Sequence, residues 1–370
     1  MNIPSKITAD IGFLKMRALR RRSLFAEVLL LLGVAAVSAQ PSRSSETLYT
    51  ESRPAMGTVF TIECYMPDRD SADRVMNAAF EEIARLEALL SNYQPSSELS
   101  RISREAGDGP VVTDPETFTF LTRSLYWSNR SHGAFDITVG PLLRAWGFKA
   151  RKGHIPTQAE QKALRRQVGW DKVQLDAAAH TVRFTTRSSM ELDPGSIGKG
   201  FAVDSVVALL RENGVHAAFI SAGGSTLYGL GAPPDEPGWP VEVPDPRTPG
   251  SVATTLRLHD TSLSTGACTE KFFVQNGHRY CHIFDPRTLM PVEGVLQSTV
   301  IAPSATDSDA LSTVVFVLPP AQSREVLRGL QGTEAILFLS APGAPTCVVF
   351  GASNSICDAH VPTTNKGVHP

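Results

Sequence analysis

The chain has 370 residues, of which 42% are apolar and 19% are charged, and its net charge is −2. This composition is that of a globular protein and excludes a disordered or collagen-like chain. Because there is no excess of basic residues, we expect no nucleic-acid partner.

The first 39 residues have the pattern of an export signal. A basic patch, 17–22, precedes an uncharged apolar run, 28–39, that ends in small residues. A membrane-spanning helix needs about 20 apolar residues, so this run is short for one. We predict a signal peptide over 1–39, with a permanent anchor as the alternative and the export route left open. The mature chain is then expected to be periplasmic, or associated with the inner membrane on its periplasmic side.

After the leader we expect a flexible polar linker, 40–52, one domain, 53–340, and a C-terminal extension, 341–370. Apolar residues at helical spacing predict a helix over 71–90. Other local signals predict a strand at 58–65, a helix from 115 toward 128, a hairpin at 172–186, a helix at 198–213 and a strand at 219–221.

In the second half, the proline-rich range 231–250 is expected to be a loop. Asn276-Gly277 predicts a two-residue hairpin turn, because both residues tolerate positive φ. That register places Phe272 opposite Cys281, so Cys268 and Cys281 are not expected to face each other. A strand at 297–302 then leads into a helix near 304. Strands and helices do not alternate regularly, which favours an α+β fold.

The five cysteines match no zinc-binding pattern. An exported chain can oxidise its cysteines, and an odd number leaves at least one unpaired. Cys347 and Cys357 are the favoured pair.

A candidate metal site lies in the helix after 304. Asp309 and Thr313 are four residues apart, so they share a helix face with Cβ atoms about 5–6 Å apart. Their oxygens suit a small hard cation such as magnesium. The alternative is ordinary helix capping by Ser304 and Asp307.

Three further segments hold candidate residues. The glycines around Lys199 resemble a phosphate loop at a helix N-terminus, although not a Walker A loop; a tight turn before a surface helix is the alternative. His282, beside an Asp-Pro turn, is a candidate general base or a structural histidine. The run 133–138 is a strand-like segment with one acid, Asp136, and Gly223-Gly224 marks a turn.

Taken together and in this order, these segments resemble the FAD:protein FMN transferase (ApbE) family. The matching motifs are Met56-Gly57-Thr58, Ser91-Asn92-Tyr93, 133–141, Trp146-Gly147-Phe148, 193–204, Gly223-Gly224, Ser264-Thr265-Gly266, 282–288 and 309–313.

The resemblance implies a single α+β domain of mixed sheets and helices with an FAD cleft. It implies magnesium-dependent transfer of FMN from FAD, the substrate, to a Thr or Ser hydroxyl of an acceptor protein, with release of AMP. The acceptor would be a flavoprotein such as a subunit of a membrane redox complex.

The resemblance also implies roles for individual residues. Asp309 and Thr313 match metal ligands, with Ser196 supplying a backbone carbonyl, and His282 matches a histidine that acts with Asp309 in catalysis. The positions that match flavin-contacting residues are Met56, Tyr93, Ala134, Phe135, Asp136, Asp193, Lys199 and Ile283.

Two positions depart from the family pattern. Ser225 stands where the family usually has Glu, and Leu289 where it has Gly, a position at which a positive φ is expected. Two other functions therefore stay open: an FAD pyrophosphatase that gives FMN and AMP, and a non-catalytic flavin-binding protein. In the family an Asn at the Tyr93 position goes with hydrolysis, and Asn92 lies next to it.

Overall fold

The computed structural model describes residues 46–248, 250–269, 271–340 and 346–351. The predicted signal peptide lies outside these ranges, so it stays a prediction. Within them, no helix is both long and apolar enough to cross a membrane.

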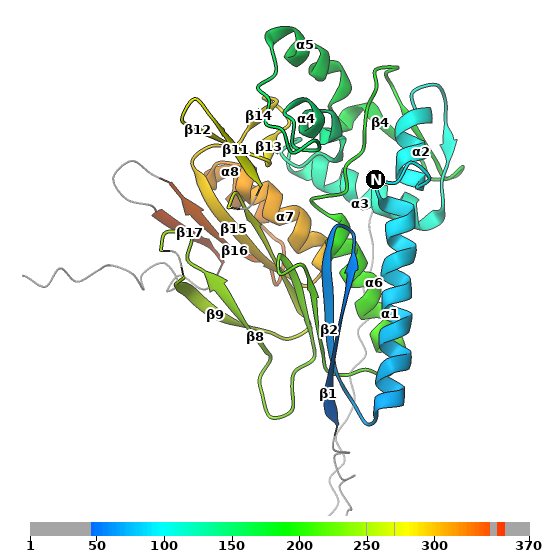
Figure 1. Cartoon of the computed structure of the whole chain (residues 1–370), viewed down its shortest axis with the longest axis vertical. Coiled ribbons are helices and arrows are strands. Elements are labelled where there is room, and N and C mark those ends of the chain that lie inside the picture. The colour runs from blue at the N-terminus through cyan, green and yellow to red at the C-terminus, as the bar shows by residue number, and fades with distance from the viewer. Residues whose placement is uncertain (1–45, 249, 270, 341–345, 352–370) are drawn as a thin grey trace, which may run out of the picture. The chain divides into compact units, whose positions relative to one another are not determined.

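An antiparallel sheet of eight strands forms the centre of the fold (Figure 1). Its order is β1-β2-β6-β7-β10-β15-β16-β17, and every neighbouring pair is antiparallel. The strands are β1 (Thr47–Ala55), β2 (Thr58–Met66), β6 (Ala218–Ala222), β7 (Thr226–Leu230), β10 (Thr261–Ala267), β15 (Val295–Ala302), β16 (Glu334–Leu339) and β17 (Thr346–Phe350).

Three helices, α1 (Arg69–Leu90), α6 (Gly198–Glu212) and α7 (Ala305–Val317), pack on one face of this sheet (Figure 1). Alternate residues of β2, Phe60, Ile62 and Cys64, point into that core and are fully buried. The ribbon of β8 (Trp239–Pro244) and β9 (Val252–Leu258) packs against residues of the other face, where Trp239 stacks on Phe219 with ring centroids 5.7 Å apart.

Smaller elements surround these layers. The helices are α2 (Glu98–Glu105), α3 (Pro115–Arg130), α4 (Gly140–Ala145), α5 (Gln158–Gln167) and α8 (Pro320–Leu327), with 3-10 turns η1 (Ile137–Val139) and η2 (Trp170–Lys172). The small sheets are β3 (Val111–Val112), β4 (Val173–Asp176) and β5 (Thr181–Phe184); β11 (Phe272–Gln275) and β12 (His278–Cys281); and β13 (Phe284–Asp285) and β14 (Met290–Pro291). The predicted α+β class is confirmed.

Three stretches differ from the expectation drawn from sequence. Strand β1 begins at Thr47, inside the expected linker, because it pairs with β2 along its whole length. Strand β17 lies inside the expected C-terminal extension and pairs with β16. The run 133–138 contains a 3-10 turn, capped by Asp136, and no strand.

The expected loop 231–250 contains strand β8, so that prediction was wrong. Its alternate residues, such as Trp239 and Val241, are buried, while Pro240 and Pro244 fall on the exposed positions. A two-stranded ribbon leaves one edge of each strand unpaired, and such an edge tolerates proline.

The cysteines also differ from expectation. Phe272 does pair with Cys281, as predicted, yet Cys281 is bonded to Cys268, with Cα atoms 5.5 Å apart. Cys268 lies just beyond the end of β10, outside the hairpin ladder, so the register did not exclude the bond. Cys347 is disulfide-bonded as well, and Cys357 lies outside the described residues. Cys64 is a free thiol.

Candidate active site

The carboxylate of Asp309 lies where α6 packs against α7. The residue is only 5% exposed. Its Oδ2 accepts a hydrogen bond from the backbone N–H of Gly200 at 2.9 Å. A Cβ on Gly200 would collide with the carbonyl oxygen of Ala305 and lie 2.8 Å from the Asp309 Cβ. The missing side chain of Gly200 therefore allows the two helices to approach closely enough for this bond.

The other oxygen of Asp309 is less fully engaged. Its Oδ1 accepts a hydrogen bond of 3.3 Å from the Thr226 hydroxyl, and the Lys199 ammonium lies 3.7 Å away. Lys199 is itself partly buried. The site thus contains a buried carboxylate with remaining acceptor capacity beside one ammonium group.

The N-terminus of α7 is held by Asp204 of α6, which sequence analysis did not single out. Its carboxylate accepts from the backbone N–H groups of Ala305, at 2.7 Å, and Thr306, at 2.8 Å. The predicted cap at Ser304 is present, since its hydroxyl accepts from the N–H of Asp307. An acid on the same face of α6 as Gly200, four residues later, was the available signal.

The residues predicted to bind magnesium fit a hard cation. Thr313 lies one helical turn after Asp309, and Ser196 lies in the turn before α6; both are partly exposed. All three donors are oxygens, which is the chemistry that magnesium prefers. Among the described residues there is no group of three His, Cys, Asp or Glu side chains that could hold a metal. The predicted set contains only one such side chain, so the ligand assignment stays a prediction.

The loop before α6 is folded onto itself. Asp193 Oδ1 accepts from the N–H of Gly195 at 2.9 Å, and the N–H groups of Ile197 and Gly198 both bond to the carbonyl of Pro194. With the Gly200 N–H bound to Asp309, several N–H groups at this helix start are already used. The structure therefore gives little support to a phosphate loop built from backbone N–H groups, and leaves the Lys199 side chain as the cationic group.

The side chains of Tyr93 and Asn92 have different surroundings, one exposed and the other hydrogen-bonded within the protein. The side chain of Asn92 donates to Asp193 Oδ2 at 2.5 Å. Tyr93 is 76% exposed, and the Lys149 ammonium lies 5.4 Å from its ring centroid. Lys149 also lies 3.8 Å from Asp193. Tyr93 is thus the ring available for stacking on a flat ligand, whereas Asn92 is engaged inside the protein.

Ala134, Phe135 and Asp136 are all buried. Asp136 accepts from the N–H and hydroxyl of Thr138, at 2.8 and 2.7 Å, and from the N–H of Trp170 at 2.9 Å. Burial raises its pKa to about 6, against these hydrogen bonds, which lower it. Because these residues are buried, their predicted contact with flavin stays a prediction.

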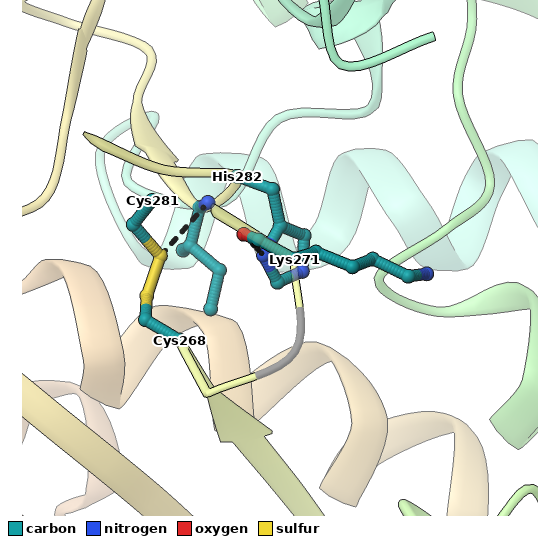
Figure 2. Close-up of a disulfide and its surroundings, with 5 residues drawn as sticks. Cys268, Lys271, Cys281 and His282 are labelled. Atoms are coloured by element: carbon teal, nitrogen blue, oxygen red, sulfur yellow. Dashed lines mark hydrogen bonds between the residues drawn. A yellow bond between two sulfur atoms is a disulfide. The ribbon is translucent and has the colours of Figure 1, made fainter. Parts of the chain in front are cut away.

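His282 follows the last residue of β12 (Figure 2). Its Nδ1 lies 3.0 Å from the carbonyl oxygen of Lys271. A carbonyl only accepts, so Nδ1 carries the hydrogen and Nε2 keeps its lone pair. Burial, with smaller contributions from the charges of Lys271 and Lys199, lowers the pKa of His282 to about 4, although the hydrogen bond to the Lys271 carbonyl opposes this shift. The ring is therefore neutral at pH 7, and no other described residue forms a hydrogen bond with its Nε2.

The remaining predicted residues lie around these groups. Met56 occupies the turn between β1 and β2 with φ of 50°, and its Cε comes within 4.0 Å of where a Cβ on Gly198 would lie. Ile283 is partly buried next to the core. Leu289 has φ of 64°, which confirms the expected positive φ at this departure from the family pattern.

Comparison with known proteins agrees with this architecture. The ApbE family model matches residues 56–337. The chain is 31% identical over 307 residues to the FAD:protein FMN transferase of Treponema pallidum, covering 78% of this chain and 83% of that protein. It is 30% identical over 295 residues to an FAD:protein FMN transferase of Klebsiella pneumoniae, covering 79% and 90%.

The fold is also similar to solved structures. The crystal structure of the apbe protein from Thermotoga maritima superposes with a TM-score of 0.73 at 27% identity, covering 83% of this chain and 97% of that one. The family match spans most of the chain, and both relatives named above carry the same enzyme name. The chain therefore belongs to the ApbE family and is a transferase enzyme.

Proposed function

We propose that this enzyme transfers FMN from FAD to a Ser or Thr hydroxyl of an acceptor protein, releases AMP and depends on magnesium. The observation that carries the proposal is the buried Asp309 carboxylate, which lies 3.7 Å from the Lys199 ammonium. A neutral His282, affected by the charge of the same lysine, supplies the base. The shared name of the two relatives supports the same reaction.

In this reaction the acceptor oxygen forms a bond to the FMN-side phosphorus, and the bond from that phosphorus to the oxygen bridging to AMP breaks. The leaving AMP takes the electron pair. His282 Nε2 would accept the proton of the acceptor hydroxyl. Lys199 would supply positive charge to the negative charge that develops on the phosphate oxygens.

Asp309 and Thr313, with the Ser196 carbonyl, would hold the magnesium ion. When bound there, magnesium would supply charge neutralisation for the diphosphate of FAD. The hydrogen bond from Gly200 fixes Oδ2 of Asp309, while Oδ1, with its longer bond from the Thr226 hydroxyl, keeps acceptor capacity for such an ion. The acceptor protein is proposed to be a flavoprotein on the periplasmic side of the inner membrane, in keeping with the predicted leader.

Transfer is favoured over hydrolysis by the arrangement at Tyr93. Its ring is 76% exposed, while Asn92 is bonded to Asp193. A stacked flavin would therefore contact a tyrosine. The resemblance to the family implies that tyrosine at this position accompanies transfer, and asparagine hydrolysis. A free-FMN product without labelled protein would instead identify a hydrolase.

The test is Asp309→Asn, assayed with FAD, magnesium chloride and a candidate acceptor by covalent flavin fluorescence on the acceptor. Asparagine can still accept from the Gly200 N–H, so we expect the fold to persist and transfer to fall by about 1,000-fold, the scale of losing a major electrostatic group. Asp309→Ala should behave alike.

Asp307→Asn is the matched control. It removes an acid two residues away that pairs with Arg123, at 2.9 Å from the arginine Nε, and does not touch the site. We expect it to retain transfer. Full activity of Asp309→Asn would contradict the proposal, and unchanged FAD in the intact enzyme would indicate a flavin-binding protein without activity.

A further inference from the structure

A disulfide lies directly beside the proposed base (Figure 2). Cys281 is the last residue of β12, and His282 is the next residue in the chain. Its partner, Cys268, is the first residue after β10, a strand of the central sheet. The bond therefore ties the backbone that carries His282 to a strand in the middle of the fold.

The same segment orients the imidazole ring. The carbonyl of Lys271, three residues after Cys268, accepts from the His282 backbone N–H at 3.2 Å and from its Nδ1 at 3.0 Å. On the other side of the histidine, the N–H of Ile283 lies 3.4 Å from the Cys281 sulfur. His282 is thus held from both sides by atoms whose positions depend on the disulfide.

The two cysteines also pack on the helix of the proposed metal site. Cys268 is 9% exposed and Cys281 is 4% exposed, and both cluster with the fully buried Phe316 of α7. Phe316 lies three residues after Thr313 on the same helix. The disulfide therefore lies where the element bearing His282 meets the element bearing Asp309.

Besides the disulfide, aromatic packing holds the hairpin that leads to His282: the rings of Phe273 and Phe148 lie 5.5 Å apart, and those of Tyr280 and Trp146 lie 5.6 Å apart. Strands β11 and β12 form a sheet of only two strands, joined by four residue pairs. Val274 of β11 is 61% exposed. An isolated two-stranded hairpin is marginally stable in water, so the hairpin alone would not hold a side chain in one place.

We propose that the Cys268–Cys281 disulfide is a positioning element for His282, and that flavin transfer requires this pair to be oxidised. The inference rests on the proposed function, because it assigns the disulfide a role in that reaction. Misplacing a reacting group by about 1 Å can cost about 100-fold in rate.

The test compares the enzyme with its Cys268→Ala/Cys281→Ala double variant. We expect kcat for acceptor labelling to fall by about 10- to 100-fold. The KM for FAD should stay within about twofold, because the proposed flavin contacts, except Ile283, lie on other elements. Cys347→Ser, which removes a cysteine that is disulfide-bonded on β17, is the matched control and should keep its kcat.

A second experiment changes the redox state of the disulfide without substituting Cys268 or Cys281. Dithiothreitol gives two electrons and two protons to the disulfide, forming two thiols. Reduction should lower kcat both in the unsubstituted enzyme and in Cys347→Ser, and reoxidation should restore it. The acidic limb of the pH–rate profile should also move up from about pH 4, because a released ring is no longer buried near Lys271 and Lys199.

Three results would overturn the inference. They are an unchanged kcat in the double variant, parallel loss of FAD binding and kcat, and an acidic limb that does not move. Each of these results would mean that the disulfide contributes to stability and does not position His282 for the reaction. Failure of the proposed function is distinguishable, because then the oxidised, unsubstituted enzyme itself would label no acceptor.

Discussion

The two halves of the proposed site are held in different ways. Asp309 lies between two core helices, buried, with its carboxylate bonded to the backbone of Gly200. His282 lies at the end of a two-stranded hairpin and is partly exposed, with a disulfide and one carbonyl fixing its position. Core packing positions the acid, whereas a covalent link, two hydrogen bonds to one carbonyl and aromatic packing of the hairpin position the base.

This difference has a consequence for substitution. A change that adds volume between α6 and α7 at the acid side must disturb their packing, so activity and stability should fall together. A change at the base side touches few core residues, so activity should fall while stability remains. The following predictions, in order of decreasing expected effect on transfer, test that contrast.

The largest effect is expected at the base. His282→Ala should lower kcat by about 100- to 10,000-fold, the range for a lost general base, with little change in FAD binding or in the free energy of unfolding. In the unsubstituted enzyme the pKa of about 4 leaves the ring neutral above that pH. The rate should therefore fall as the pH drops through about 4.

His278→Ala is the control for that variant. It removes a histidine of the same hairpin, which pairs with Glu293 at 2.9 Å. We expect it to retain transfer and the same acidic limb. A His282→Ala enzyme with normal kcat would show that another group accepts the proton.

A smaller effect on transfer, with a larger one on stability, is expected at Gly200, which packs against the acid. On helix propensity alone, Gly200→Ala would stabilise the protein by about 1 kcal/mol. The new Cβ, however, would collide with the Ala305 carbonyl and crowd Asp309, an overpacking that costs about 1–3 kcal/mol. We expect the collision to dominate in urea unfolding and kcat to fall by about tenfold.

The informative result is whether Gly200→Ala lowers or raises the free energy of unfolding. Gly109→Ala is the control, because a Cβ at Gly109 would meet no atom within 4 Å. That variant should be close to neutral. A stabilised Gly200→Ala enzyme would mean that α6 and α7 are less closely packed than described.

The smallest effect on transfer is expected at Leu289. Its φ of 64° costs about 1–2 kcal/mol, which glycine would relieve. Its side chain is only 3% exposed and clusters with Trp146 and Phe284, and losing it costs about 2–5 kcal/mol. Leu289→Gly should therefore destabilise the enzyme by about 1–3 kcal/mol in urea unfolding, with kcat unchanged. A gain in stability would show that backbone strain outweighs burial here.

Local signals predicted much of the fold. The spacing of apolar residues located α1, and the Asn276-Gly277 turn gave the register of β11 and β12. Strand β8 was missed because its prolines resemble a loop until their exposed, alternate placement on a ribbon is known.

Contacts between distant segments could not be predicted in this way. Asp309 and Thr313 are visible as a helical pair, but the bond from Gly200 to Asp309 joins residues 109 positions apart. The cap that Asp204 gives to α7 is likewise formed between two helices. The bond between Cys268 and Cys281 depends on chain beyond the end of a strand, where the hairpin register gives no information.

The burial of Cys64 has a consequence for how the chain forms its disulfides. Its thiol is fully buried in β2, and burial raises its pKa to about 11. At pH 7 only about one molecule in 10,000 would then carry a thiolate there, and the thiolate is the species that attacks disulfides. Once β2 has folded, the Cys64 thiol is withdrawn from disulfide exchange, so it does not reshuffle the native pairings.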